Sequence, residues 1–193
     1  MWTIPNQITL FRIILIPVFV LIFYLPITWS HFGAFVVFWF AAVSDALDGY
    51  LARRLNQSSP FGAFIDPVAD KLMVVCALAM LIQDYNIWYI TIPAALMISR
   101  EVFISALREF MSSRGKRDVI AVSDVGKYKT AAQMLGIMGL IWQPSYDIPL
   151  ILFNLPHEIF MIIAYGFYSI ATILTFTSML TYFKAAWPEL KAN

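Results

Sequence analysis

Apolar residues occur in six long runs, at about 8–25, 32–54, 61–82, 88–112, 126–143 and 157–183. Each run is close to the ~20 residues that an α-helix needs to cross a bilayer. Shorter segments rich in proline, asparagine, serine and charged residues separate the runs. No alternating ten-residue pattern accompanies them, so we expect no strands. The pattern predicts an all-α integral membrane protein, a six-transmembrane-helix bundle that forms a single domain over residues 1–193.

Composition supports a membrane protein. Of the 193 residues, 61% are hydrophobic and 13% are charged, whereas soluble domains have about 25% charged residues. The net charge is only +1 and the basic residues are scattered. A nucleic-acid partner is therefore not expected.

Basic residues also predict the orientation. The connections at 26–31, 83–87 and 144–156 contain no lysine or arginine. By the positive-inside rule, these connections face outward, and both termini are cytoplasmic. We expect a multi-pass protein of the cell inner (cytoplasmic) membrane.

Four aspartates lie within the second and third apolar runs: Asp45, Asp48, Asp66 and Asp70. A carboxylate at membrane depth costs roughly 2.5–3.5 kcal/mol. Asp45 and Asp70 lie at similar depths, roughly 14–15 Å from the polar turn that joins the two predicted helices. We expect the two helices to be antiparallel neighbours and the four carboxylates to meet in one pocket open to the cytoplasm.

Such a pocket predicts a metal site. Clustered carboxylates repel unless cations neutralise them, and all-oxygen ligands suit Mg²⁺, Mn²⁺ or Ca²⁺. Gly49, Ala52 and Gly62 interleave with the aspartates and allow a helix or ligand to approach closely. The alternative, salt bridges with nearby basic residues, does not explain the matched depth or the glycines.

The pattern Asp45-x2-Asp48-Gly49-x2-Ala52-Arg53-x8-Gly62-x3-Asp66-x3-Asp70 resembles the signature of the CDP-alcohol phosphotransferases. Members of that family are six-helix membrane enzymes, usually dimeric, that transfer a substituted phosphoryl group from a CDP-linked donor to an alcohol and release CMP. The resemblance implies two Mg²⁺ or Mn²⁺ ions held by the four aspartates, and Asp70 as the general base. It also implies a homodimer. The residues expected to bind CDP are Asn6, Thr9, Asp48, Gly49, Ala52, Arg53, Gly62 and Asp66.

Three further segments bear on the acceptor alcohol: Pro5-Asn6-x2-Thr9-x2-Arg12, Ser99-Arg100-Glu101 and Gly126-Lys127-x-Lys129-Thr130-x2-Gln133. Adjacent residues on a helix point about 100° apart, so we expect Arg100 to face the pocket rather than pair with Glu101. A cationic pocket suits an acceptor that carries a phosphate. The residues expected to bind that phosphate are Arg12, Arg100, Lys127, Lys129 and Thr130. The alternatives are a structural Arg100–Glu101 pair and lysines that only anchor the cytoplasmic side.

These segments resemble those of the bacterial phosphatidylglycerophosphate synthases. The resemblance implies a phosphatidyltransferase that joins CDP-diacylglycerol to sn-glycerol 3-phosphate, giving phosphatidylglycerol phosphate and CMP. Other acceptors remain open, as in cardiolipin, phosphatidylserine or phosphatidylinositol-phosphate synthases. A divalent-cation transporter using the same carboxylates is a further alternative, although the outer half lacks a charged path.

Overall fold

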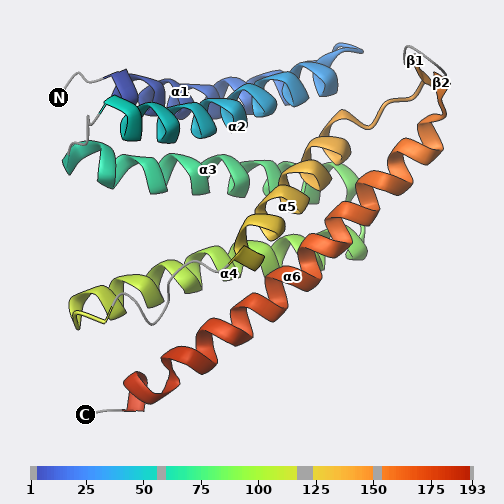
Figure 1. Cartoon of the computed structure of the whole chain (residues 1–193). Helices are drawn as coiled ribbons and strands as arrows, with labels where there is room; N and C mark the ends of the chain where they lie inside the picture. Colours follow the sequence, from blue (N-terminus) through green and yellow to red (C-terminus); the bar gives the residue numbers. More distant parts are fainter. Residues whose placement is uncertain (1–3, 56–59, 117–123, 150–153, 192–193) are drawn as a thin grey trace.

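The computed structural model describes residues 4–55, 60–116, 124–149 and 154–191, with the side chains of 4–5, 46–55, 60, 63 and 124–127 left aside. Figure 1 shows the first helices lying roughly side by side, with the last two running obliquely to them. In chain order the elements are α1 (Ile4–Phe23), α2 (Ser30–Leu55), α3 (Pro60–Tyr85), α4 (Trp88–Ser113), α5 (Asp124–Trp142), β1 (Ile148–Pro149), β2 (Asn154–Leu155) and α6 (His157–Lys191).

The helices cover the six apolar runs, so the prediction of an all-helical architecture is confirmed. Within the described residues, three helices contain stretches long and apolar enough to cross a membrane: Asn6–Phe23, Trp88–Ser113 and His157–Lys191. Two helix ends are marked by residues with left-handed backbone, Asn86 (φ 47°) after α3 and Gln143 (φ 32°) after α5, a conformation that commonly ends a helix. Local sequence therefore determines where these helices start and stop.

The sequence does not predict two features, one in the connection before the last helix and one in the last helix itself. The segment between α5 and α6 forms a small antiparallel hairpin, in which Ile148 pairs with Leu155 and Pro149 with Asn154. Proline is tolerated there because a two-stranded hairpin consists of edge strands. Helix α6 also continues to Lys191 and has 35 residues. Its length of roughly 52 Å exceeds the ~30 Å of a bilayer core.

Helix α1 is a packing partner of both α2 and α3. It packs against both of them, whereas α2 and α3 make little contact with each other. Helices α2 and α3 also contact each other directly, but over a smaller area of the described residues than either shares with α1. The most extensive packing is between α5 and α6, where Gly136 and Gly139 lie against α6. Buried apolar side chains from all six helices form the core, among them Phe19, Phe38, Leu78, Met97, Leu140 and Tyr168.

Candidate active site

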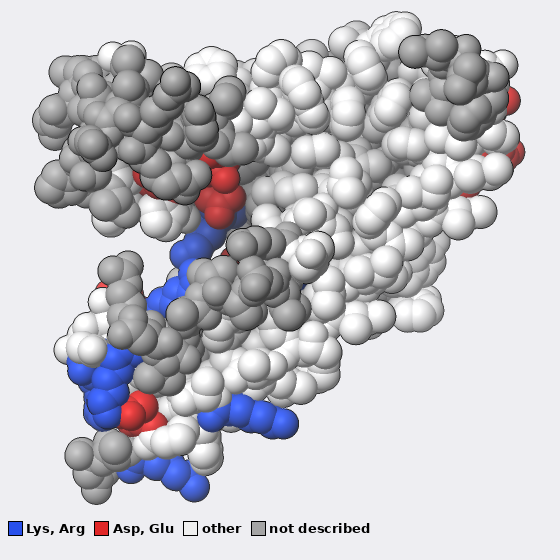
Figure 2. Space-filling view, in the orientation of Figure 1, with Lys and Arg blue, Asp and Glu red and all other residues white. Residues whose placement is uncertain are grey.

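A cavity of about 410 Å³ lies between five of the helices. Figure 2 shows acidic and basic side chains meeting in a hollow on one face of the molecule. The residues that line the cavity are Asp45, Asp66, Pro67, Asp70, Lys71, Val74, Arg100, Glu101, Arg108, Lys129, Thr130, Gln133, Met134 and Tyr182. Four carboxylates and four cations thus share one partly enclosed space, which is suited to a ligand with several charges.

The acidic side of the cavity comes from α2 and α3. Asp45 lies on α2, and Asp66 and Asp70 lie one helical turn apart on α3. Three of the four predicted carboxylates therefore line one cavity. Asp48, whose side chain lies outside the described part, is on the same helix as Asp45.

Side chains of α1 bind two of these carboxylates. Thr9 Oγ1 donates a hydrogen bond of 2.5 Å to Asp66 Oδ1, and Arg12 Nη1 donates to Asp45 Oδ1 in an ion pair. Thr9 and Arg12 are both buried. Because a hydrogen bond to a charged group is strong, these two contacts orient Asp45 and Asp66. The buried arginine also has a carboxylate partner, which lowers the cost of placing it inside the helix bundle.

The donor set fits a divalent cation. Carboxylate oxygens are the ligands that Mg²⁺ and Mn²⁺ prefer. A second, small cavity of about 20 Å³ lies against Arg12, Asp45 and Asp70, and about 10–15 Å³ is enough for one water-sized group. In the described arrangement, the oxygens of Asp45, Asp66 and Asp70 do not all lie within 4.8 Å of one another. Arg12 provides the positive charge beside Asp45 here.

Another group of potential ligands lies elsewhere. Among the described side chains, Asp147, His157 and Glu158 bring three ligand atoms within 4.8 Å of one another. They lie where the hairpin leads into α6 (Figure 1), at the end of α6 remote from Tyr182 of the cavity. Asp147 Oδ1 also accepts a 3.1 Å hydrogen bond from the backbone N–H of His157. We interpret this contact as a helix cap.

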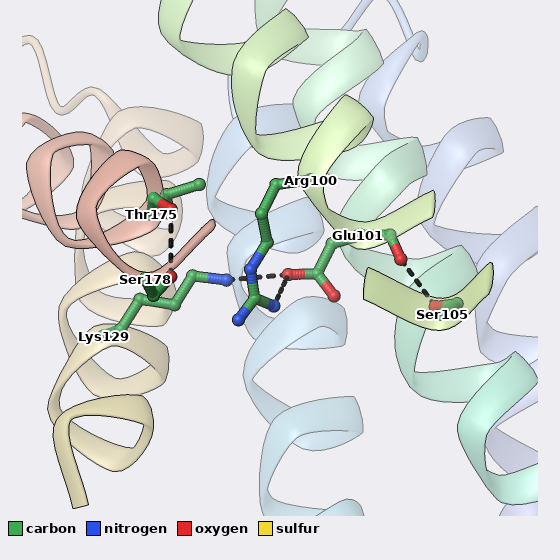
Figure 3. Close-up of polar contacts among 6 residues, drawn as sticks. All are labelled: Arg100, Glu101, Ser105, Lys129, Thr175 and Ser178. Carbon is green, nitrogen blue, oxygen red and sulfur yellow. Dashed lines mark hydrogen bonds and ion pairs between the residues drawn. The ribbon is translucent and has the colours of Figure 1, made fainter. Parts of the chain in front are cut away.

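The basic side of the cavity is built around one carboxylate. Glu101 Oε1 accepts a hydrogen bond of 2.9 Å from Arg100 Nη1 and one of 2.7 Å from Lys129 Nζ. Figure 3 shows the three side chains converging from α4 and α5. The aromatic ring of Tyr182 on α6 lies 5.9 Å from Arg100 Cζ. Three helices therefore meet at this cluster.

The pairing of Arg100 with Glu101 corrects the expectation drawn from helix geometry. The Cα–Cβ bonds of neighbouring helix residues diverge, but the arginine side chain is long enough to turn back to the adjacent carboxylate. Arg100 nevertheless lines the cavity as expected. Both interpretations from the sequence, a pocket residue and a Glu101 partner, thus describe the same side chain.

The other predicted residues fall into four groups. Lys129 and Thr130 line the large cavity. Arg12 lines only the small one, because its guanidinium pairs with Asp45. Asn6, Thr9 and Gly62 are buried. The predictions for Gly49, Ala52, Arg53 and Lys127 concern side chains outside the described part of the chain.

Sequence reasoning missed several residues that line the cavity. Arg108 lies about two turns beyond Arg100 on α4, and Tyr182 comes from α6. Neither belongs to a motif, so only the packing of α4 and α6 could reveal them. Lys71 directly follows Asp70, and Gln133 is the last residue of the quoted Lys129 segment, although neither is among the predicted binding residues. Their positions beside predicted residues could have indicated them.

Comparison with known proteins agrees with these features. The model of the family described as CDP-alcohol phosphatidyltransferase matches residues 2–183. A protein of Yersinia enterocolitica and one of Yersinia pestis, both named CDP-diacylglycerol–glycerol-3-phosphate 3-phosphatidyltransferase, are 50% identical over 187 residues, 97% of this chain and 96% of theirs. A protein of Shigella flexneri with the same name is 48% identical over 189 residues, 98% of this chain and 97% of its own. The chain therefore belongs to the CDP-alcohol phosphatidyltransferase family.

Proposed function

We propose that this chain transfers the phosphatidyl group from CDP-diacylglycerol to sn-glycerol 3-phosphate, giving phosphatidylglycerol phosphate and CMP. The names of the relatives describe this transfer. One observation carries the proposal for this chain: carboxylates of α2 and α3 face the buried cations of α4 and α5 across a single cavity. A pyrophosphate donor beside divalent ions and an anionic acceptor need these two kinds of surface side by side.

In the proposed reaction, a hydroxyl oxygen of glycerol 3-phosphate attacks the lipid-linked phosphorus of CDP-diacylglycerol. A new P–O bond forms, the P–O bond to CMP breaks, and CMP leaves with the electron pair. The hydroxyl proton passes to a carboxylate oxygen of Asp70, which acts as general base. Asp70 lines both the large and the small cavity, so it lies beside the acidic cluster and within the space open to the acceptor.

Four aspartates would hold two Mg²⁺ or Mn²⁺ ions: Asp45, Asp48, Asp66 and Asp70. When bound, such ions would neutralise the negative charge of the pyrophosphate. Thr9 and Arg12 orient two of these carboxylates from α1. The CDP group would lie near the α1 residues Asn6 and Thr9 and near the small residues of α2 and α3, and Arg53 would bind a phosphate oxygen.

The phosphate of the acceptor would lie at the basic side of the cavity. Arg100, Lys129 and Thr130 would hold it, with Lys127 nearby on α5. Arginine and lysine suit a phosphate because both remain charged and donate several hydrogen bonds. This part of the site distinguishes a phosphorylated acceptor from a neutral alcohol.

The lipid chains of the donor have an apolar place near the site. A groove of about 550 Å³ between α2, α5 and α6 is lined by residues such as Trp39, Leu135 and Phe167. Ala42 borders both this groove and the small cavity beside Asp45. An acyl chain in the groove would remain among apolar groups while its phosphate reaches the carboxylates.

Six membrane spans, cytoplasmic termini and a site that faces the cytoplasm of the inner membrane complete the proposal, together with a homodimer. The three described helices that are long and apolar enough to cross a membrane, and the absence of lysine and arginine from the three outer connections, support the topology.

An acceptor panel tests the proposal. Purified full-length protein with CDP-diacylglycerol and Mg²⁺ is offered glycerol 3-phosphate, phosphatidylglycerol, serine or inositol phosphate, and the lipid product is identified. We expect phosphatidylglycerol phosphate and stoichiometric CMP with glycerol 3-phosphate alone. A product from another acceptor, with none from glycerol 3-phosphate, would reject the proposed substrate but keep the chemistry. Uptake of Mn²⁺ into vesicles without CMP release would favour a transporter.

A further inference from the structure

We propose that Glu101 is a positioning residue, which holds Arg100 and Lys129 together so that both can bind the phosphate of the acceptor. This inference rests on the proposed function and adds a residue to it. Glu101 is the only member of the trio that carries a negative charge, so it is not itself expected to bind a phosphate. Its effect on the reaction would pass through the two cations.

A shared acceptor atom fixes the spacing of the cations. Arg100 Nη1 and Lys129 Nζ both donate to the same oxygen, Glu101 Oε1, at 2.9 and 2.7 Å. The two nitrogens can therefore be no farther apart than the sum of these distances. Figure 3 shows Lys129 reaching Glu101 from a different helix, so this oxygen also joins α5 to α4. The same spacing lets two donors contact neighbouring oxygens of one phosphate.

Burial makes the negative charge of Glu101 necessary. Lys129 is only 3% exposed and Arg100 only 8%, so water screens their mutual repulsion poorly. With Glu101 removed, two like charges would face each other in a space of low polarity, and the flexible lysine would turn away. Glu101 reduces the charge of the trio to a net +1, which still attracts an anionic acceptor.

Donors remain for a ligand after Glu101 is bound. A lysine ammonium has three N–H donors and an arginine guanidinium has five. Arg100 Nε is buried, and it has no hydrogen-bond partner among the described residues. Both side chains also line the large cavity. Glu101 therefore orients the two cations without occupying all of their hydrogen-bonding capacity.

The backbone of Glu101 makes one further contact within α4. Ser105 Oγ donates a 2.5 Å hydrogen bond to the backbone carbonyl of Glu101. On the other side, the ring of Tyr182 lies 5.9 Å from Arg100 Cζ. The cluster is thus held from three helices, as a binding site with a fixed geometry requires.

The experiment measures kcat and KM for both substrates in purified full-length protein with Mg²⁺. The variants are Glu101→Gln, which keeps the size and loses the charge, Glu101→Ala, and Glu101→Asp, which keeps the charge. Glu109→Gln is the matched control, since it changes an exposed glutamate on the same helix that does not line the cavity.

We expect Glu101→Ala and Glu101→Gln to raise the KM for glycerol 3-phosphate about tenfold or more, the effect of losing about one charge-assisted hydrogen bond. The KM for CDP-diacylglycerol should stay within about twofold of wild type, because uniform binding of the donor is unchanged. Glu101→Asp should recover part of the loss, and Glu109→Gln should behave as wild type. A role in folding alone would lower the yield or the melting temperature without separating the two KM values.

Three outcomes would overturn the inference: an unchanged KM for glycerol 3-phosphate in Glu101→Gln, equal rises in both KM values, or no recovery in Glu101→Asp. If Glu101→Ala does not fold, Glu101→Gln decides, because its side chain has nearly the same volume. Turnover of glycerol 3-phosphate by wild type separates the two hypotheses. If wild type turns over glycerol 3-phosphate and the variants have a normal KM, only the role of Glu101 is rejected. If wild type does not turn over glycerol 3-phosphate, the proposed function fails, and the inference about Glu101 fails with it.

Discussion

Gly136 lies where α5 packs closely against the backbone of α6, and replacing it tests how the fold supports the site. A Cβ atom added at Gly136 would lie 2.7 Å from the backbone nitrogen of Tyr168 and 2.8 Å from its Cα. These are backbone atoms, so no side-chain rotation relieves the clash. Relief requires the two helices to separate by several tenths of an ångström, toward the 3.4 Å of ordinary contact. We therefore expect Gly136→Ala to destabilise the protein.

The size of the effect can be estimated from two opposing terms. Overpacking a tight interface typically costs about 1–3 kcal/mol. Alanine gains about 1 kcal/mol over glycine in helix propensity. Gly166→Ala on α6 is a matched control because a Cβ there would meet nothing within 4 Å, so it reports the propensity gain alone. The free energies of unfolding of the two variants should therefore differ by about 1–3 kcal/mol.

The assay is thermal unfolding of the full-length protein in one detergent, followed by kinetics. For a chain of this size, about 1 kcal/mol corresponds to roughly 2–4 °C in Tm. We expect Gly136→Ala to melt about 2–12 °C below Gly166→Ala. Tyr168 is held by its hydroxyl, which donates a 3.0 Å hydrogen bond to the carbonyl of Ile90 on α4. A shift of α6 should therefore also weaken the contacts between α4 and α5.

A Tm for Gly136→Ala that equals or exceeds that of Gly166→Ala would refute the reasoning, since it would mean that the helices can separate at no cost. A second check is the KM for glycerol 3-phosphate, which should rise in Gly136→Ala because Lys129 is on α5 and Arg100 on α4. An unchanged KM with a lowered Tm would limit the effect to stability.

Three further changes test the proposed chemistry. Asp70→Asn should lower kcat by about 10²–10⁴-fold, the usual contribution of a general base, while circular dichroism stays helical; near-normal turnover would reject Asp70 as the base. Excess chelator should stop CMP release and added Mg²⁺ or Mn²⁺ should restore it, so full activity in chelator would count against ions at the four aspartates. Arg100→Ala should raise the KM for glycerol 3-phosphate by about 10–100-fold and the KM for CDP-diacylglycerol far less. Equal changes in both would remove Arg100 from the acceptor site.

The helices themselves follow from the sequence, because each depends on residues near one another in the chain. Every predicted apolar run coincides with a helix, and the predicted boundaries differ from the observed ones by a few residues in α1 to α5. The longer α6 is an exception. Its last turns carry polar and charged residues such as Lys184 and Glu189, so hydropathy predicted an earlier end, although the helix continues.

The aspartate motif predicted the place of the acidic cluster for a similar reason. Residues spaced by three or four lie on one face of a helix, so Asp66 and Asp70 had to lie on the same side. That two carboxylate-bearing helices face one cavity was inferred from equal depth along the chain. The cavity lined by Asp45, Asp66 and Asp70 confirms this part, and the signature was enough to indicate the family.

Partners that are distant in the sequence were decided only by tertiary packing. Thr9 contacts Asp66 across 57 positions of the chain, and Lys129 contacts Glu101 across 28. No local pattern encodes such a pairing, because it depends on which helices pack together and how they are rotated. Hydropathy and motif spacing thus determine the helices, the acidic stripe and the family. Tertiary packing determines which charges neutralise one another. Helix α1 packs beside α2 and α3, and α4, α5 and α6 meet around Glu101.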